Sequence, residues 1–169
     1  MDLILELAKE EQAEEICNLV NLAYRGETGW TKETDLVSGD RSTIDEVRRY
    51  MKDDKAHLLV VNEGGVIKAC ICIEQDNDRA FIGYFAVHPS EQGRGIGKEI
   101  LALAENYAST KLDLKKYMML VVSQRRELIS YYERQGYVRT GDIQEYPVHL
   151  NVGVPKKKGL TIERLEKNA

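Results

Sequence analysis

The chain has 169 residues and a formal net charge of −4, with 43% hydrophobic and 31% charged residues. This composition is ordinary for a globular domain that buries its own core. It excludes a transmembrane helix, because no apolar run approaches the roughly 18 residues that span a bilayer. It also argues against a general nucleic-acid binder, which needs a basic face. Acidic residues among the first ten positions do not fit a secretory signal, so we expect a cytoplasmic protein.

Hydrophobic periodicity predicts an α/β fold with a mixed central sheet, in a single domain over residues 1–169. The predicted elements, in chain order, are a strand at 3–9, helices at 12–24 and 43–53, a hairpin at 57–76, a strand at 81–87, a helix at 97–108, a strand at 117–122, a helix at 124–136, and strands at 137–143 and 160–166. The strand, helix and strand between 81 and 122 predict a crossover that joins two parallel strands. Helices therefore flank the sheet.

Two local signals mark helix ends. Thr43 and Glu46 have the spacing of a capping box at the start of the second helix. Gly136 stands where a left-handed residue ends the last helix.

The cysteines are three in number, Cys17, Cys70 and Cys72, which predicts free thiols in an intracellular chain. Cys70 and Cys72 lie two apart in a predicted strand and share one face. Such residues are typically small and buried. No second pair of ligands and no nearby histidine completes a zinc site, so we expect no bound metal.

The segment Gln92-Gly93-Arg94-Gly95-Ile96-Gly97 lies between a predicted strand and a predicted helix. A helix N-terminus offers unpaired N–H groups and suits anions, and glycines let a ligand approach the backbone. A tight turn without a ligand is the alternative. A nucleotide P-loop is excluded, because Glu99 stands where its Ser or Thr is needed, and the spacing of the dinucleotide fingerprint also fails.

The pattern that fits is Gln/Arg-x-x-Gly-x-Gly/Ala, and here the chain resembles the GCN5-related N-acetyltransferase (GNAT) superfamily. The resemblance covers most of the chain and implies a sheet in which two central parallel strands splay apart, 81–87 and 117–122. It implies acetyl-CoA as the co-substrate. Its pyrophosphate would bind the N–H groups of Gln92, Gly93, Arg94, Gly95, Ile96 and Gly97, and Arg94 and Lys98 would supply positive charge.

The same resemblance implies that Phe85, Ala86 and Val87 pair with the pantetheine arm through main-chain hydrogen bonds, as an added strand would. A main-chain N–H near Val87 would stabilise the oxyanion. Proton donation to the departing thiolate falls to a tyrosine in Tyr131-Tyr132-Glu133-Arg134-Gln135-Gly136-Tyr137, where Tyr132 occupies the acid position. Core packing of Tyr132, or Tyr131 as the acid, are the alternatives.

One position departs from the family pattern. Many relatives carry an asparagine seven residues before the tyrosine, where this chain has Arg125. Arg125 would either meet a phosphate or be solvated.

The acceptor end of the site is predicted in the loop between the first two helices. Glu27, Trp30 and Glu33 are the candidate substrate-binding residues, since a large aromatic side chain among polar residues often lines a pocket, although Trp30 packed on the core as a loop anchor is the alternative. The carboxylates of Glu27, Glu33 and Asp35 favour a cationic acceptor such as a polyamine, an aminoglycoside or a lysine. Glu27, Glu33, Glu74 and Asp78 are candidate general bases, and proton loss through a water chain, with these residues as ordinary exposed carboxylates, is the alternative.

The sequence therefore predicts an acetyl-CoA-dependent N-acetyltransferase that acetylates a primary amine of a small molecule or peptide, by direct attack in a ternary complex. No cysteine has a neighbouring histidine that would support an acyl-enzyme. A non-catalytic acyl-CoA-binding sensor on the same fold is the alternative. The final strands are a candidate homodimer interface.

Overall fold

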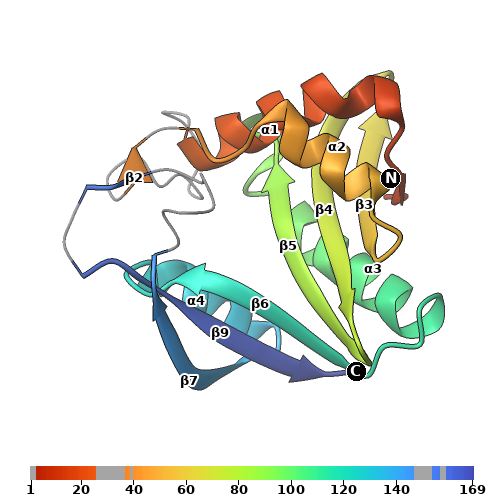
Figure 1. The fold of residues 1–169 in the computed structure, drawn as a ribbon. Helices are drawn as coiled ribbons and strands as arrows, with labels where there is room; N and C mark the ends of the chain where they lie inside the picture. The colour runs from red at the N-terminus through yellow and green to blue at the C-terminus, as the bar shows by residue number, and fades with distance from the viewer. Residues whose placement is uncertain (1–2, 26–36, 39, 147–153, 157–158) are drawn as a thin grey trace.

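The computed structural model describes residues 3–25, 37–38, 40–146, 154–156 and 159–169 (Figure 1). The helices are η1 (Glu10–Gln12), α1 (Ala13–Arg25), α2 (Ile44–Lys52), η2 (Pro89–Glu91), α3 (Ile96–Thr110) and α4 (Arg126–Arg134). The strands are β1 (Glu6–Leu7), β2 (Val37–Ser38), β3 (Ala56–Glu63), β4 (Val66–Asp76), β5 (Arg79–Val87), β6 (Lys116–Val122), β7 (Val138–Glu145), β8 (Val154–Pro155) and β9 (Thr161–Asn168). No helix in these ranges is long and apolar enough to cross a membrane.

Seven strands form a mixed sheet in the order β1-β3-β4-β5-β6-β9-β7. All neighbours are antiparallel except β5 and β6, which are parallel. These two strands pair only from Arg79 to Phe81 on β5 and from Lys116 to Met118 on β6. Beyond these positions they diverge, as Figure 1 shows. The predicted splay of two central parallel strands is confirmed.

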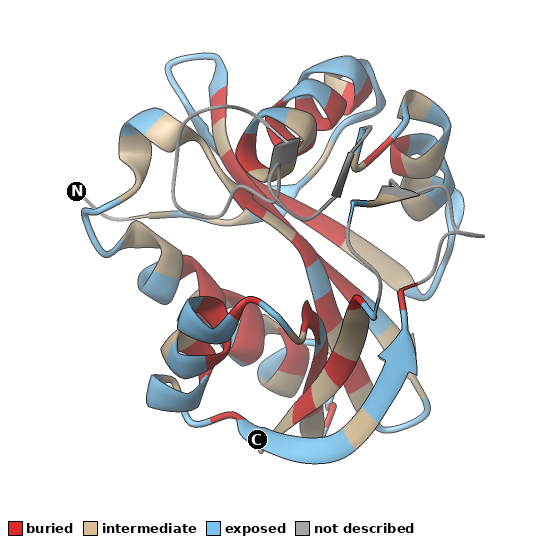
Figure 2. Cartoon of the chain, turned by 90° about the vertical axis from the view of Figure 1, so that its left-hand side faces the viewer, coloured by how far each residue is buried: buried red, intermediate tan, exposed pale blue. Residues whose placement is uncertain are grey.

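Helices cover both faces of the sheet. The inward stripes of α1 and α2 pack on one face, around Val20 and Val47. Those of α3 and α4 pack on the other, around Ile100 and Ile129. Figure 2 shows the buried residues gathered on the central strands and on the inner sides of the helices. Cys70 belongs to the α1 and α2 side, as do the other two cysteines.

Strand β5 carries a β-bulge where it leaves β6. Its register with β4 shifts between Cys70 and Cys72, so that Tyr84 and Phe85 together oppose Ile71. Tyr84 has a left-handed backbone with φ +51°. A residue with a Cβ adopts this conformation at a cost of about 1–2 kcal/mol, so the surrounding packing must hold it there.

The bulge decides which side chains of β5 face which layer. Ile82 faces α3 and α4, and regular alternation would send residue 84 to that same side. The extra residue reverses the order, because Tyr84 and Ala86 pack with α1 and α2 while Phe85 and Val87 pack with α3 and α4. One extra residue thus reverses the face of the sheet to which every following side chain of the strand points.

Tyr84 is anchored by a buried polar network. Its hydroxyl shares a hydrogen bond with the Ser42 hydroxyl, and Ser42 also donates to the carboxylate of Glu46. Its ring packs edge-on against Tyr50, with 5.1 Å between centroids. The thiol of Cys70 donates to the main-chain oxygen of Tyr84 at 3.4 Å. These contacts hold both the side chain and the main chain of the strained residue.

The predicted helix ends are largely confirmed. The N–H of Glu46 donates to the Thr43 hydroxyl at 3.2 Å, which is the forward half of the capping box. The Glu46 carboxylate points to Ser42 and Arg41. Gly136 has φ +99° just after α4, as expected of a left-handed ending.

The differences from the sequence prediction involve short strands. The predicted strand at 3–9 pairs with β3 only at Glu6–Leu7. A small sheet of β2 and β8 joins the loop after α1 to the segment before β9, and the periodicity analysis missed it. Two-residue strands have no hydrophobic period to detect, and only tertiary contacts define them.

Candidate active site

The glycine loop, residues 92–97, connects η2 to the first turn of α3. Gly93 has φ +85°, and Gly95, the N-cap of α3, has φ +77°. Both are left-handed conformations that glycine adopts without strain. A Cβ built on either residue would meet no protein atom within 4 Å. Open space beside a helix N-terminus is therefore available to a ligand, and the backbone amides of the loop border it.

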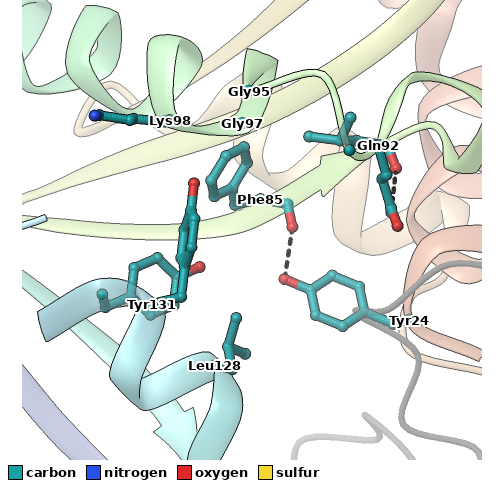
Figure 3. Close-up of a pocket in the computed structure, with 11 residues that line it drawn as sticks. Tyr24, Phe85, Gln92, Gly95, Gly97, Lys98, Leu128 and Tyr131 are labelled. Carbon is teal, nitrogen blue, oxygen red and sulfur yellow. Dashed lines mark hydrogen bonds between the residues drawn. The ribbon is translucent and has the colours of Figure 1, made fainter. Parts of the chain in front are cut away.

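A cavity of about 310 Å³, the first cavity, lies against this loop (Figure 3). It extends from the start of α3, along the end of β5, to α4. Its lining residues are Tyr24, Phe85, Val87, Gln92, Gly93, Gly95, Gly97, Lys98, Leu128, Tyr131 and Tyr132. Eight of these were predicted from the sequence; Tyr24, Leu128 and the competing Tyr131 complete the lining.

Three of the predicted cofactor-binding residues do not line the first cavity. Ala86 is buried against the α1 side, because the bulge turns it away. Ile96 packs on the core formed with α3 and α4. The side chain of Arg94 is 71% exposed and lies 3.6 Å from the carboxylate of Glu91. Lys98 is thus the one predicted cationic residue in the cavity wall.

The edge of β5 that faces the splay has two of its carbonyl groups occupied. The main-chain N–H of His88 donates to the Lys68 oxygen on β4, so the preceding residue, Val87, directs its main-chain groups away from β4. The Tyr24 hydroxyl donates to the Phe85 oxygen at 2.7 Å. The Gln92 side-chain amide donates to the Val87 oxygen at 3.0 Å. Both carbonyls are thus already hydrogen-bonded, and the N–H of Val87 is the donor that this edge offers to an incoming ligand.

Tyr132 lies on α4 and is largely buried, at 9% exposure. Within the described part of the chain its hydroxyl has no hydrogen-bond partner. Burial raises its pKa far above the ordinary value for tyrosine, and the nearby hydroxyls of Tyr24 and Tyr131 act in the same direction, opposed by Arg125. The phenol is therefore neutral and keeps its proton at physiological pH.

Tyr131, the competing tyrosine, lies closer to the glycine loop. Its hydroxyl is 3.5 Å from the position of a Cβ built on Gly97, and burial raises its pKa also. Its ring packs edge-on against Tyr132, with 5.3 Å between centroids. Figure 3 shows the Tyr131 hydroxyl directed toward the start of α3.

A larger cavity of about 610 Å³, the second cavity, occupies the opening between β5 and β6. Its charged lining residues are Arg41, Glu46, Arg49, Asp53 and Glu74, and aromatic side chains from α1, α2 and β5 complete much of the wall. Four residues line both cavities, and together they form the junction: Tyr24, Phe85, Leu128 and Tyr132.

The carboxylates of the second cavity are only partly balanced. Glu46 lies 3.5 Å from Arg41 and 3.8 Å from Arg49. Asp53 and Glu74 have no ion-pair partner among the described residues. Desolvation raises the pKa of Glu74, and the charge of Asp53 raises it further. A partly buried carboxylate such as Glu74, with a second carboxylate close by, favours a cationic ligand.

The sequence-predicted acceptor residues have different outcomes. Glu27, Trp30 and Glu33 lie outside the described residues. Glu74 lines the second cavity, whereas Asp78 lines neither cavity and lies in the turn before β5. Glu46 and Asp53 were missed, because carboxylates on and just after an amphipathic helix look like an ordinary solvated face.

The comparison with known families decides the identity of the fold. The sequence model of the Acetyltransferase (GNAT) family matches residues 13–137. The chain belongs to this family. The expected fold, the acetyltransferase activity and acetyl-CoA as co-substrate are confirmed. A search of curated proteins gives no match.

Solved structures agree with the GNAT fold. A spermidine N-acetyltransferase from Vibrio cholerae in complex with CoA and spermine has a TM-score of 0.72 and 19% identity, over 98% of this chain and 95% of that chain. The spermidine/spermine N-acetyltransferase SpeG from Vibrio cholerae in complex with manganese ions has a TM-score of 0.71 and 18% identity, over 98% and 92%. At such identities the likeness shows the shared fold.

The departure at Arg125 has a structural outcome. Its side chain is 2% exposed, lies at the N-cap of α4 and approaches Glu127 at 3.5 Å. Arg125 lines neither cavity. The prediction of a solvated side chain is therefore wrong. The alternative prediction, a contact between Arg125 and a phosphate, is not supported by either cavity, since the buried Arg125 side chain lines neither of them.

The cysteines of this GNAT protein are poorly suited to nucleophilic attack. All three are buried. Burial raises the pKa of Cys70 to about 12, raises that of Cys72 still higher, and raises that of Cys17, which nearby carboxylates raise further. Because the thiolate is the nucleophile, a thiol of such pKa is almost entirely unreactive at neutral pH.

We predict that iodoacetamide at about pH 8 leaves Cys70 and Cys72 unmodified in the folded protein, since roughly one Cys70 thiol in 10,000 is ionised there. Intact-mass spectrometry measures the additions, and the urea-unfolded protein, in which all three cysteines react, is the control. Rapid native alkylation of Cys70, or an acetyl group on a cysteine after incubation with acetyl-CoA, contradicts this prediction.

Proposed function

We propose that this GNAT protein transfers the acetyl group of acetyl-CoA to a primary amine by direct attack in a ternary complex. The observation that carries the proposal is the junction. The first cavity, beside the glycine loop, meets the second cavity, with its excess of carboxylates, at Tyr24, Phe85, Leu128 and Tyr132. A thioester entering from one side and an amine from the other would meet there.

The glycine loop is proposed to hold the pyrophosphate of acetyl-CoA. The main-chain amides of residues 92–97 supply donors, and the positive end of the α3 dipole favours the anion. Lys98 lines the cavity and would add direct countercharge. Arg94, exposed and near Glu91, would contribute at longer range.

The pantetheine arm is proposed to lie along the open edge of β5. Tyr24 and Gln92 occupy the carbonyls of Phe85 and Val87. Amide oxygens of the arm would therefore accept from strand N–H groups. An N–H at the same edge, near Val87, would also stabilise the oxyanion, since it is held in place before the reaction begins.

The proposed reaction has one nucleophile and one acid. A neutral amine attacks the thioester carbonyl, forming the N–C bond, and the C–S bond then breaks. The departing thiolate takes the proton of the Tyr132 hydroxyl. The nitrogen loses one proton to solvent in the second cavity, and solvent returns one to Tyr132. In the net reaction the amine nitrogen loses one hydrogen and gains the acetyl group, and the sulfur of CoA gains one hydrogen.

Glu74 is proposed to bind charge and not to remove the proton directly. It pairs with Phe81, four residues before Phe85. Because the bulge adds one residue to this stretch of β5, only three regular steps of about 3.3 Å separate the two positions, which places Glu74 on the order of 10 Å from the junction. Together with Asp53 it would bind a second ammonium group at the far end of the acceptor.

The acceptor is therefore proposed to be a small cationic amine with more than one ammonium group, such as a polyamine. Asp53 and Glu74 support this assignment, and the Vibrio cholerae enzymes that share the fold carry polyamine names. Glu27, Trp30 and Glu33 remain proposed contributors to the same site.

We predict that Gly95→Ala weakens acetyl-CoA binding by at least about 10-fold, because a Cβ would project into the ligand space. Gly141→Ala is the matched control. It imposes similar strain at φ +83° on β7, away from both cavities. Isothermal titration calorimetry measures both variants. Equal affinities would show that the glycine loop does not hold the cofactor.

We predict that Tyr132→Phe lowers kcat by about 10- to 1000-fold while the Kd for acetyl-CoA stays nearly constant, as loss of a general acid requires. Stopped-flow thiol release and calorimetry give the two values. Tyr131→Phe is measured in parallel. A large loss of kcat in Tyr131→Phe alone would assign the acid to Tyr131.

We predict that a thiol-release screen over monoamines, polyamines, aminoglycosides and lysine peptides gives turnover, with the highest kcat/KM for polyamines. Glu74→Gln should raise KM for a polyamine by about 5- to 30-fold and leave KM for a monoamine unchanged, because only the polyamine carries a second charge. Binding of acetyl-CoA without turnover of any amine would instead support an acyl-CoA sensor.

A further inference from the structure

Two of the four junction residues carry a hydroxyl group. Tyr132 is the proposed acid, and the Tyr24 hydroxyl donates a hydrogen bond to the main chain of β5. Tyr24 lies in the last turn of α1, a different layer of the fold from α4. Tyr24 and Tyr132 both line the two cavities, so each reaches the junction from its own layer.

Two contacts with described residues bear on the orientation of Tyr24. Its hydroxyl donates to the Phe85 main-chain oxygen at 2.7 Å, across the end of the splay. The guanidinium of Arg41 lies 5.6 Å from the centre of its ring. Figure 3 shows the hydroxyl aimed at the Phe85 carbonyl, with Leu128 and Tyr131 on the opposite wall. The oxygen of Tyr24 is therefore held at the junction.

The bond to Phe85 also fixes the chemical character of this oxygen. A phenol has one proton to donate and two lone pairs that accept. With its proton directed to a main-chain carbonyl, the Tyr24 oxygen meets a ligand as a hydrogen-bond acceptor. A neutral primary amine approaching from the second cavity carries N–H donors and a single lone pair.

We infer that Tyr24 orients the acceptor amine for attack. One N–H of the neutral amine donates to the Tyr24 oxygen, and this directs the nitrogen lone pair toward the thioester carbonyl. The inference rests on the proposed function and adds a residue on the acceptor side of the site. Because Tyr24 lines both cavities, a competing role is to support the cofactor-binding edge of β5 alone.

The test compares Tyr24→Phe with Tyr117→Phe. The Tyr117 hydroxyl also donates to a main-chain oxygen, that of Glu105 at 2.9 Å, but Tyr117 lines neither cavity. Three quantities are measured for each variant: kcat/KM for the amine, the Kd for acetyl-CoA, and the slow hydrolysis of acetyl-CoA without an amine.

We expect Tyr24→Phe to lower kcat/KM for the amine by about 5- to 30-fold, the effect of one lost hydrogen bond. The Kd for acetyl-CoA and the rate of hydrolysis should stay at the values of Tyr117→Phe. An unchanged kcat/KM overturns the inference, and so does a loss confined to acetyl-CoA affinity. Failure of the wild-type protein to acetylate any amine overturns the proposed function itself and is seen before any variant is made.

Discussion

The early end of pairing between β5 and β6 is the constraint on which the rest of the site depends. Parallel strands normally continue side by side, yet these two share only three residue pairs. The bulge at Tyr84 lies just past this point, and a left-handed backbone at a tyrosine is stable only because Ser42, Tyr50 and Cys70 hold it. Both cavities open from this local departure from regular sheet geometry.

An opened sheet edge usually invites unwanted strand pairing. Here Tyr24 and Gln92 occupy the carbonyls of Phe85 and Val87, so the edge is partly closed to another strand. The N–H of Val87 is the donor that the edge offers to an amide oxygen of an extended arm. The same two hydrogen bonds therefore make the edge less accessible to another strand. Gln92 belongs to the glycine loop and Tyr24 to α1, so the arrangement links cofactor and acceptor sides.

The two cavities differ in charge in a way that suits their proposed ligands. The first has helix N-terminal amides and Lys98, which attract an anion. The second has three carboxylates and two arginines, and Asp53 and Glu74 stay without an ion-pair partner in the described ranges. Because the chain carries a net charge of −4, the anionic ligand depends on the local dipole and not on the overall field.

Much of this protein was readable from its sequence. Hydrophobic periods predicted the long helices and strands, since burial of one face dictates them locally. The spacing from Gln92 to Gly97 predicted the loop, and the segment around Tyr132 predicted a tyrosine in the cavity wall. The bulge at Tyr84 was not predicted. Its cause is a set of contacts from α2 and the preceding segment, and no local pattern encodes them.

The acceptor side of the site was also decided by the tertiary structure, because it depends on contacts that no local sequence pattern encodes. Tyr24, Glu46 and Asp53 come from segments that look like the ordinary ends and polar faces of helices. Only the packing of α1 and α2 over the splayed strands brings them to the second cavity. Sequence determined which segments are regular and where the glycine loop begins. Which side chains meet across the opening follows from a one-residue shift in β5, which turns Phe85 and Val87 toward α3 and α4, and from contacts far apart in the chain.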